Sequence, residues 1–191
     1  MPVTLQDVLK QLDTDEPDYT ALTALGPDAV PHLTTLVRSD DPGVAAKAAY
    51  LASLIQADES IEALSSAVAS PHEVVRVAAA AGLRNLAGPQ ATRLAERLLD
   101  DGDAGVRKVA LNAVGRLGLT TLAAKVRSMA SSDDETALRA VARQELERLG
   151  GGGEAPRARK RGRKARATRP RSGGAGAAGA RKRKRSSAKR R

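Results

Sequence analysis

The chain has 191 residues, enough for one ordinary domain, and Tyr19 and Tyr50 are its only aromatic residues. Its alanine- and leucine-rich composition suits closely packed helices and disfavours a large β-sandwich. The absence of cysteine excludes disulfides and thiolate chemistry. No apolar run approaches the ~20 residues of a membrane span.

The net charge of +10 is unevenly distributed along the chain. Residues 1–150 hold 15 Lys and Arg against 21 Asp and Glu, a net charge of −6. Residues 151–191 hold 17 Lys and Arg against Glu154 alone, a net charge of +16. The basic character therefore belongs to the C-terminal part, and the two parts are expected to have different partners.

The first 26 residues predict two short helices that form an N-terminal cap. Thr4 suits the N-cap of a helix that runs through Leu12, and a second helix carries Tyr19 and ends at Gly26. Their apolar residues do not share the spacing of the later segments. This is expected of a terminal unit, because its outer face has no neighbour.

One amphipathic helix then occurs four times. Apolar residues fall at offsets of 0, 4, 8 and 11 in each copy, which places them on one stripe of a helix. Successive copies are 31, 31 and 32 residues apart. The four stripes are Val44, Ala48, Ala52, Ile55; Val75, Ala79, Leu83, Leu86; Val106, Ala110, Val114, Leu117; and Leu138, Ala142, Leu146, Leu149.

A leading helix precedes each copy, so that each unit consists of a helix, a turn and a second helix. Gly26-Pro27 and Gly88-Pro89 lie 62 residues apart and mark the starts of leading helices. A single unit cannot bury its own apolar stripe, whereas stacked units share a continuous core. The predicted organisation is a domain at 1–149, with a cap at 1–26 and repeats at about 27–57, 58–88, 89–118 and 119–149.

These repeats resemble HEAT repeats, and the short period is similar to the subtype first described in phycobilisome lyases. The resemblance rests on an Asp- or Pro-containing turn, then Val-Arg, a small residue four positions on, and apolar residues at eight and eleven. It implies an all-α fold, a right-handed α-solenoid of antiparallel helix pairs whose second helices line a concave face used as a scaffold. It also implies that Arg76, Arg107 and Arg139 form a structural ladder, in which each guanidinium bonds to turn carboxylates or carbonyls of adjacent repeats. Lyase activity is not implied, because many unrelated proteins share the repeat.

Residues suited to catalysis or metal binding are sparse. His32 and His72 are the only histidines, and without cysteine or a His-x-x-x-His spacing no metal site is expected. Acidic residues recur in the turns at 40–41, 100–101 and 133–135, where we interpret them as helix N-terminal caps rather than as acid/base pairs or a cation site. We predict no catalytic residue and no cofactor. HEAT-like DNA glycosylases are a poor match, because this acidic domain lacks Trp and Phe.

Tyr50 stands out within the predicted solenoid. It lies about 240° around the helix from the core stripe, at the position that Ala81, Asn112 and Gln144 occupy in the other copies. Two interpretations remain open: a contact on the concave face, or a tyrosine partly packed near the cap.

Residues 150–156 predict a Gly-rich linker, and residues 157–191 predict a disordered tail, because alanine is the only apolar residue type there. We expect the tail to bind DNA or RNA phosphates without sequence specificity, since no aromatic residue offers a stacking platform. The predicted phosphate contacts are Arg157, Arg159, Lys160, Arg161, Arg163, Lys164, Arg166, Arg169, Arg171, Arg181, Lys182, Arg183, Lys184, Arg185, Lys189, Arg190 and Arg191.

The composition of the tail resembles the basic extensions of actinobacterial nucleoid proteins and linker histones. Nuclear import through Arg181–Arg185, anionic lipid, or an intramolecular contact with the acidic domain are alternatives. The sequence thus predicts a monomeric, non-enzymatic adaptor with a protein partner on the solenoid, cytoplasmic and nucleoid-associated in a bacterium or nuclear in a eukaryote. The alternative is an accessory or chaperone-like factor, similar to the lyase-type HEAT proteins.

Overall fold

The computed structural model describes residues 3–55 and 57–150, which form ten α-helices, three short 3-10 helices and no strand. The α-helices are α1 (Leu5–Leu12), α2 (Tyr19–Thr23), α3 (Val30–Leu36), α4 (Pro42–Leu54), α5 (Ser60–Val68), α6 (Glu73–Gly82), α7 (Gly88–Leu99), α8 (Ala104–Leu117), α9 (Ala123–Ser132) and α10 (Thr136–Gly150). The 3-10 helices are η1 (Gly26–Ala29), η2 (Leu83–Asn85) and η3 (Thr120–Leu122).

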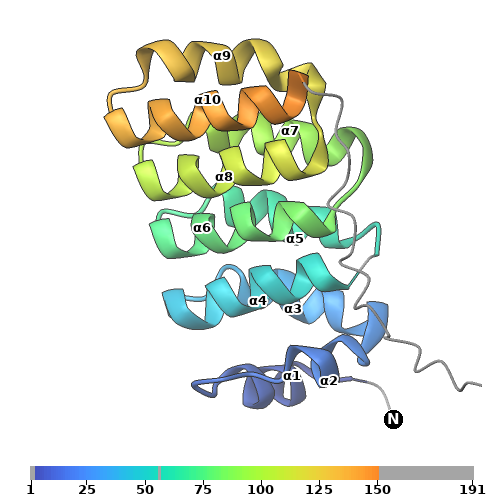
Figure 1. Cartoon of the computed structure of the whole chain (residues 1–191). Helices are drawn as coiled ribbons and strands as arrows, with labels where there is room; N and C mark the ends of the chain where they lie inside the picture. The colour runs from blue at the N-terminus through green and yellow to red at the C-terminus, as the bar shows by residue number, and fades with distance from the viewer. Residues whose placement is uncertain (1–2, 56, 151–191) are drawn as a thin grey trace, which may run out of the picture. The chain divides into compact units, whose positions relative to one another are not determined.

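The helices after the cap stack in antiparallel pairs (Figure 1). The pairs are α3 with α4, α5 with α6, α7 with α8, and α9 with α10. The second helices α4, α6, α8 and α10 pack against one another in sequence and form one layer, and the leading helices form the layer behind them. This arrangement confirms the predicted fold class, an all-α solenoid of helix pairs.

The predicted apolar stripe of the second helices forms the core together with leading-helix residues such as Leu33, Leu64 and Leu98. Ala48, Ala79, Ala110 and Ala142 are fully buried at the same position of the four copies. A side chain as small as alanine lets neighbouring helix axes approach closely, which explains why the repeats keep alanine at this position. Leu86 and Leu117, at the ends of two stripes, are only partly buried, whereas Leu149 at the end of the fourth is buried.

The helix starts follow local signals in the sequence. Thr4 accepts a hydrogen bond from the backbone N–H of Asp7, and the Asp7 carboxylate accepts one from the backbone N–H of Thr4, so the two residues form a capping box for α1. Gly26 and Gly88 adopt φ values of 66° and 74°, in the left-handed region that glycine tolerates best. The repeated Gly-Pro pair therefore marks the same sharp reversal of the chain twice.

The structure differs from the expectation at the start of the first repeat. The second cap helix ends at Thr23 rather than near Gly26, and Gly26–Ala29 form a 3-10 turn before α3 begins at Val30. Proline at the second position of η1 suits this turn, because its missing N–H would be unsatisfied there in any case. Across the described residues, no helix combines the length and apolarity needed to span a membrane.

Candidate interaction site

Two second-helix arginines of the predicted ladder each join two turns. The Nε and Nη2 atoms of Arg107 donate to the two carboxylate oxygens of Asp133, both at 3.0 Å, and Nη1 donates to the Asp101 and Gly102 carbonyls at 2.9 and 3.1 Å. One repeat earlier, Arg76 donates to the carboxylate of Asp101 at 2.7 and 3.1 Å and to two carbonyls of its own turn. Each guanidinium thus connects its own turn to the turn of the next repeat.

Arg139 occupies the same position in α10. It donates to the carbonyls of Asp133 and Asp134 at 2.5 and 3.4 Å and to the hydroxyl of Thr136 at 2.7 Å. Its bonds all stay within its own turn. The contacts of Arg76 and Arg107 confirm the ladder that the resemblance implied, whereas Arg139 bonds no adjacent repeat among the described residues and in that respect departs from it.

The carboxylates of the ladder are nearly buried and strongly bonded. The Asp133 and Asp101 side chains are only 5% and 8% exposed. Hydrogen bonds from Arg107 hold the pKa of Asp133 below its usual range, against the opposing effect of burial. For Asp101, burial acts to raise the pKa, but the bonds from Arg76 and from the Asp103 backbone outweigh it, so the pKa is lowered.

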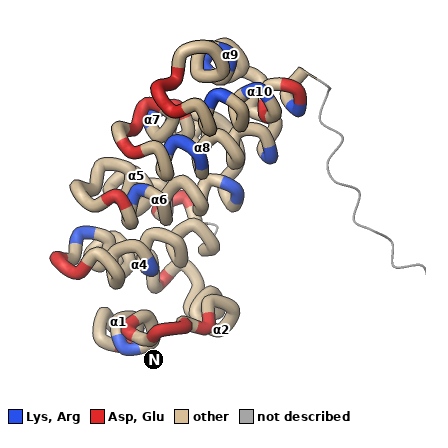
Figure 2. The backbone as a smooth tube through the Cα atoms, turned by 60° about the vertical axis from the view of Figure 1, so that its left-hand side comes forward, with Lys and Arg blue, Asp and Glu red and all other residues tan. Residues whose placement is uncertain are grey.

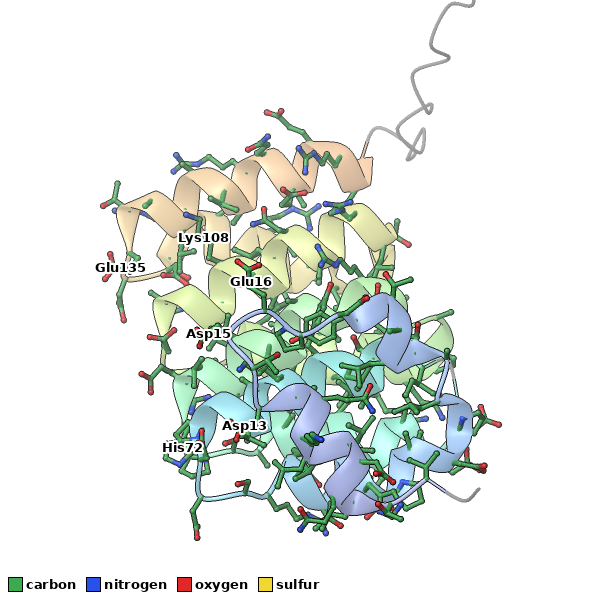
Figure 3. All side chains as sticks on the ribbon, turned by 90° about the horizontal axis from the view of Figure 1, so that it is seen from below. Asp13, Asp15, Glu16, His72, Lys108 and Glu135 are labelled. Atoms are coloured by element: carbon green, nitrogen blue, oxygen red, sulfur yellow. The ribbon has the colours of Figure 1, made fainter. Side chains whose placement is uncertain are left out.

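Two other acidic turn residues cap helices. Asp41 accepts hydrogen bonds from the backbone N–H groups of Gly43 and Val44 at the start of α4, and Asp103 accepts one from Val106 at the start of α8. Acidic positions gather at the turns that precede the second helices (Figure 2), and Glu135 and His72 both lie in these turns (Figure 3). The capping interpretation thus holds for the cluster at 40–41, whereas Asp101 and Asp133 of the other two clusters pair with the ladder arginines, and the cap of α8 is Asp103.

A groove opens on the layer of second helices. It has a volume of about 320 Å³, and α6, η2, α8 and α10 contribute its walls. Arg84, Arg116 and Arg148 provide the charge, and the other lining residues are Ala80, Ala81, Val109, Asn112 and Ala113. We call this feature the arginine groove. Its arginines are absent from the predicted binding residues, although they recur in the sequence at intervals of 32 residues.

One wall of the arginine groove is fixed by a buried ion pair. Arg148 donates to both carboxylate oxygens of Glu145, at 2.8 and 3.0 Å, and the Glu145 side chain is 1% exposed while that of Arg148 is 49% exposed. Glu145 lies over Gly115 of α8, where an added Cβ would come within 1.8 Å of the carboxylate Oε2. Glycine at this position therefore makes the room that the ion pair occupies.

Tyr50 lies beside this surface and is half-buried. Its ring packs edge-to-face against Tyr19 of the cap at a centroid distance of 5.1 Å, and its hydroxyl accepts a hydrogen bond from Arg84 at 2.6 Å. The tyrosine is thus partly packed near the cap and also orients one arginine of the groove. Of its equivalents, Ala81 and Asn112 line the groove, and Gln144 does not.

The two histidines occupy structural positions, and the predicted phosphate contacts lie outside the described part of the chain. His32 Nε2 is 2.9 Å from the Val3 carbonyl oxygen, and His72 is the N-cap residue of α6. No cluster of three or more metal-binding side chains occurs among residues 3–55 and 57–150. All 17 predicted phosphate contacts, the linker after Gly150 and the expected disorder of the tail lie outside the described residues.

Comparisons with known proteins agree with the repeat architecture. Residues 61–147 match the family model of HEAT repeats. A solved structure of the complex of CpcE and CpcF of phycocyanin lyase from Nostoc sp. PCC7120 is similar to this chain, with a TM-score of 0.60 and 23% sequence identity. The match covers 74% of this chain and 96% of that one, and it shows a shared fold. No curated protein matches the sequence.

Proposed function

We propose that this protein is a non-enzymatic adaptor, with a HEAT-like solenoid that binds a protein partner and a basic tail that binds nucleic acid. The arginine groove is the observation that carries the first half of the proposal. Arg76 and Arg107 are engaged in the ladder, whereas Arg84 and Arg116 have no carboxylate within ion-pair distance among the described residues. A groove of charged and small apolar side chains on a rigid repeat scaffold suits recognition of another protein chain.

The second half of the proposal rests on the distribution of charge. Residues 151–191 carry 17 Lys and Arg against one Glu, whereas residues 1–150 have a net charge of −6. Arginine and lysine bind phosphates and release condensed counterions, which makes such binding salt-dependent and insensitive to base sequence. The solenoid itself, with its net negative charge, is expected to add nothing to DNA affinity.

The proposal that the tail, and not the solenoid, binds nucleic acid is tested with duplex DNA of arbitrary sequence. Binding is measured by fluorescence anisotropy in a salt series. The full chain should bind, with log K falling against log salt at a slope of about −7 if ~8 phosphates are contacted. A chain that ends at Gly150 should not bind, and alanine at Arg181–Arg185 in the full chain should reduce the slope. DNA binding by residues 1–150, or a strong sequence preference, would contradict the proposal.

A second candidate function is that of an accessory or chaperone-like factor for another protein. The likeness to the CpcE–CpcF complex of phycocyanin lyase, over 96% of the matched chain, favours this candidate. Such a factor would use the same groove, but its tail would contact lipid, an import receptor or its own solenoid. Absence of DNA binding at low salt, together with protein binding at the groove, would favour the accessory role over the adaptor.

A further inference from the structure

We infer that the arginine groove binds an extended acidic segment of a partner protein, with an Asp or Glu at every third residue. This inference rests on the proposed protein-binding role of the solenoid and specifies the chemistry of the partner. It follows from the charge of the groove, its apolar floor and the spacing of its arginines.

The charge of the groove is opposite to that of the domain around it. Residues 1–150 have a net charge of −6, yet the groove lining contains three arginines and no acidic residue. Arg148 is bonded to Glu145, but Arg84 donates only to the neutral Tyr50 hydroxyl, and the Arg116 side chain has no hydrogen bond within the described residues. Planar guanidinium groups with unused donors are suited to bidentate binding of carboxylates.

The floor of the groove distinguishes a peptide from other anionic ligands. Ala80, Ala81, Val109 and Ala113 form an apolar surface between the arginines. A peptide can place small apolar side chains on this surface while its carboxylates reach the arginines, whereas a phosphate backbone offers nothing apolar to bury. The groove lining has no aromatic side chain on which a base could stack.

The spacing of the arginines favours an extended occupant. Arg84, Arg116 and Arg148 belong to three successive repeats, so their row crosses the second helices. Packed helices lie about 8–10 Å apart. A polyproline II segment repeats its side-chain direction every three residues, with a rise of about 9 Å. Acidic residues three positions apart would therefore meet successive arginines.

The chain's own tail does not suit this groove. Residues 157–191 have 17 Lys and Arg and no Asp or Glu, so the tail has the same sign of charge as the three arginines. Like charges at short range cost free energy and would direct the tail elsewhere. The occupant is therefore expected to come from another protein.

The inference is tested with the full chain and a fluorescein-labelled peptide of five Glu-Pro-Ala repeats. Anisotropy gives the Kd of the unaltered chain and of two groove variants. Asn112 is exposed and lines the groove, so Asn112→Trp fills the groove and leaves the charge unchanged. The double variant Arg84→Glu/Arg116→Glu reverses the charge of the groove. Both variants should raise the Kd at least about tenfold, and the matched Gln-Pro-Ala peptide should bind at least about tenfold more weakly.

A matched variant distinguishes the effect of the groove arginines from the effect of the net charge of the protein. Arg97→Glu/Arg127→Glu makes the same change of net charge at two exposed arginines of α7 and α9, in the layer of leading helices. It should raise the Kd by no more than about threefold. Every sample contains unlabelled duplex DNA at saturating concentration to occupy the tail, so that the peptide reports on the solenoid. Thermal melting followed by circular dichroism checks that each variant is folded.

Four outcomes would overturn the inference. Equal weakening by the two double variants, with no effect of Asn112→Trp, would assign peptide binding to overall charge or to the tail. Equal affinity for the Gln-Pro-Ala peptide would show that the peptide carboxylates do not contribute to binding. Loss of duplex DNA binding in the groove variants would make the groove a nucleic-acid site. Failure of peptide binding with normal tail-dependent DNA binding would overturn this inference alone and leave the nucleic-acid half of the proposed function standing.

Discussion

The layer of second helices carries two rows of arginines, and the first two members of each row have different surroundings. Near the helix starts, Arg76 and Arg107 are bonded to buried carboxylates and to turn carbonyls, so their charge is compensated inside the fold. Near the helix ends, Arg84 and Arg116 face the arginine groove with no carboxylate partner among the described residues. The same residue type in the same layer therefore has a structural role at Arg76 and Arg107 and is available for binding at Arg84 and Arg116.

The difference arises from what the neighbouring repeat offers. At the helix starts, the next turn supplies an aspartate to the arginine before it, and the pair is largely shielded from water. At the helix ends, the corresponding space opens to the groove instead. Removal of a paired and shielded arginine leaves a buried carboxylate without a partner, whereas removal of an exposed arginine does not.

The largest expected effect comes from breaking the ladder. Arg107→Ala should lower the free energy of unfolding by about 3 kcal/mol, because Asp133 and two turn carbonyls lose their donors. Arg116→Ala, in the same helix, should change it by no more than about 0.5 kcal/mol. Urea unfolding of both variants measures the difference. Equal effects of the two substitutions would show that the rows do not differ as described.

A smaller effect is expected at the wall of the groove. Gly115→Ala should lower the free energy of unfolding by about 1–3 kcal/mol, because the new methyl group collides with the buried Glu145 carboxylate. Helix propensity alone would predict a gain of about 1 kcal/mol, so the sign of the effect is informative. In a Glu145→Ala background, the same substitution should cost much less. Urea denaturation of the unaltered chain, the two single variants and the double variant completes this double-mutant cycle. Additive effects would contradict the contact between Gly115 and Glu145.

The smallest expected effect is a loss of folding stability at acidic pH. The folded-state pKa values of Asp101 and Asp133 are lowered, so their contribution to stability is full above the unfolded value of about 3.9 and is lost as the pH falls through the folded values. Stability should therefore be nearly constant from pH 7 to about 5 and should decrease below about 4.

The Arg107→Ala variant provides the comparison for the pH experiment. Without its arginine partner, Asp133 should regain a higher pKa, so the acid-induced loss of stability should be smaller in the variant than in the unaltered chain. Thermal melting between pH 7 and pH 2 measures both curves. Parallel curves would show that the ion pair has no part in the acid response.

Much of the architecture followed from the sequence because periodicity determines which face of a helix is buried. The stripe that contains Ala110 and Val114 predicted their burial, and the alignment of the copies predicted the shared position of Arg76, Arg107 and Arg139. Local signals also predicted the cap at Thr4. The boundary of the first repeat was less accurate, because Gly-Pro is compatible with a 3-10 turn as well as with the first turn of an α-helix.

Only the tertiary structure distinguished the two rows of arginines. Their sequence spacing is equally regular, and a guanidinium carries the same charge wherever it lies. Its role depends on whether a carboxylate from a residue some 25 positions away reaches it, as Asp133 reaches Arg107 and none reaches Arg116 within the described residues. The sequence by itself therefore determined the repeat, its core and the separation of charge between solenoid and tail. The packing of one repeat against the next decided which arginines are bonded internally and which line a groove, because that contact brings together residues that no local pattern connects.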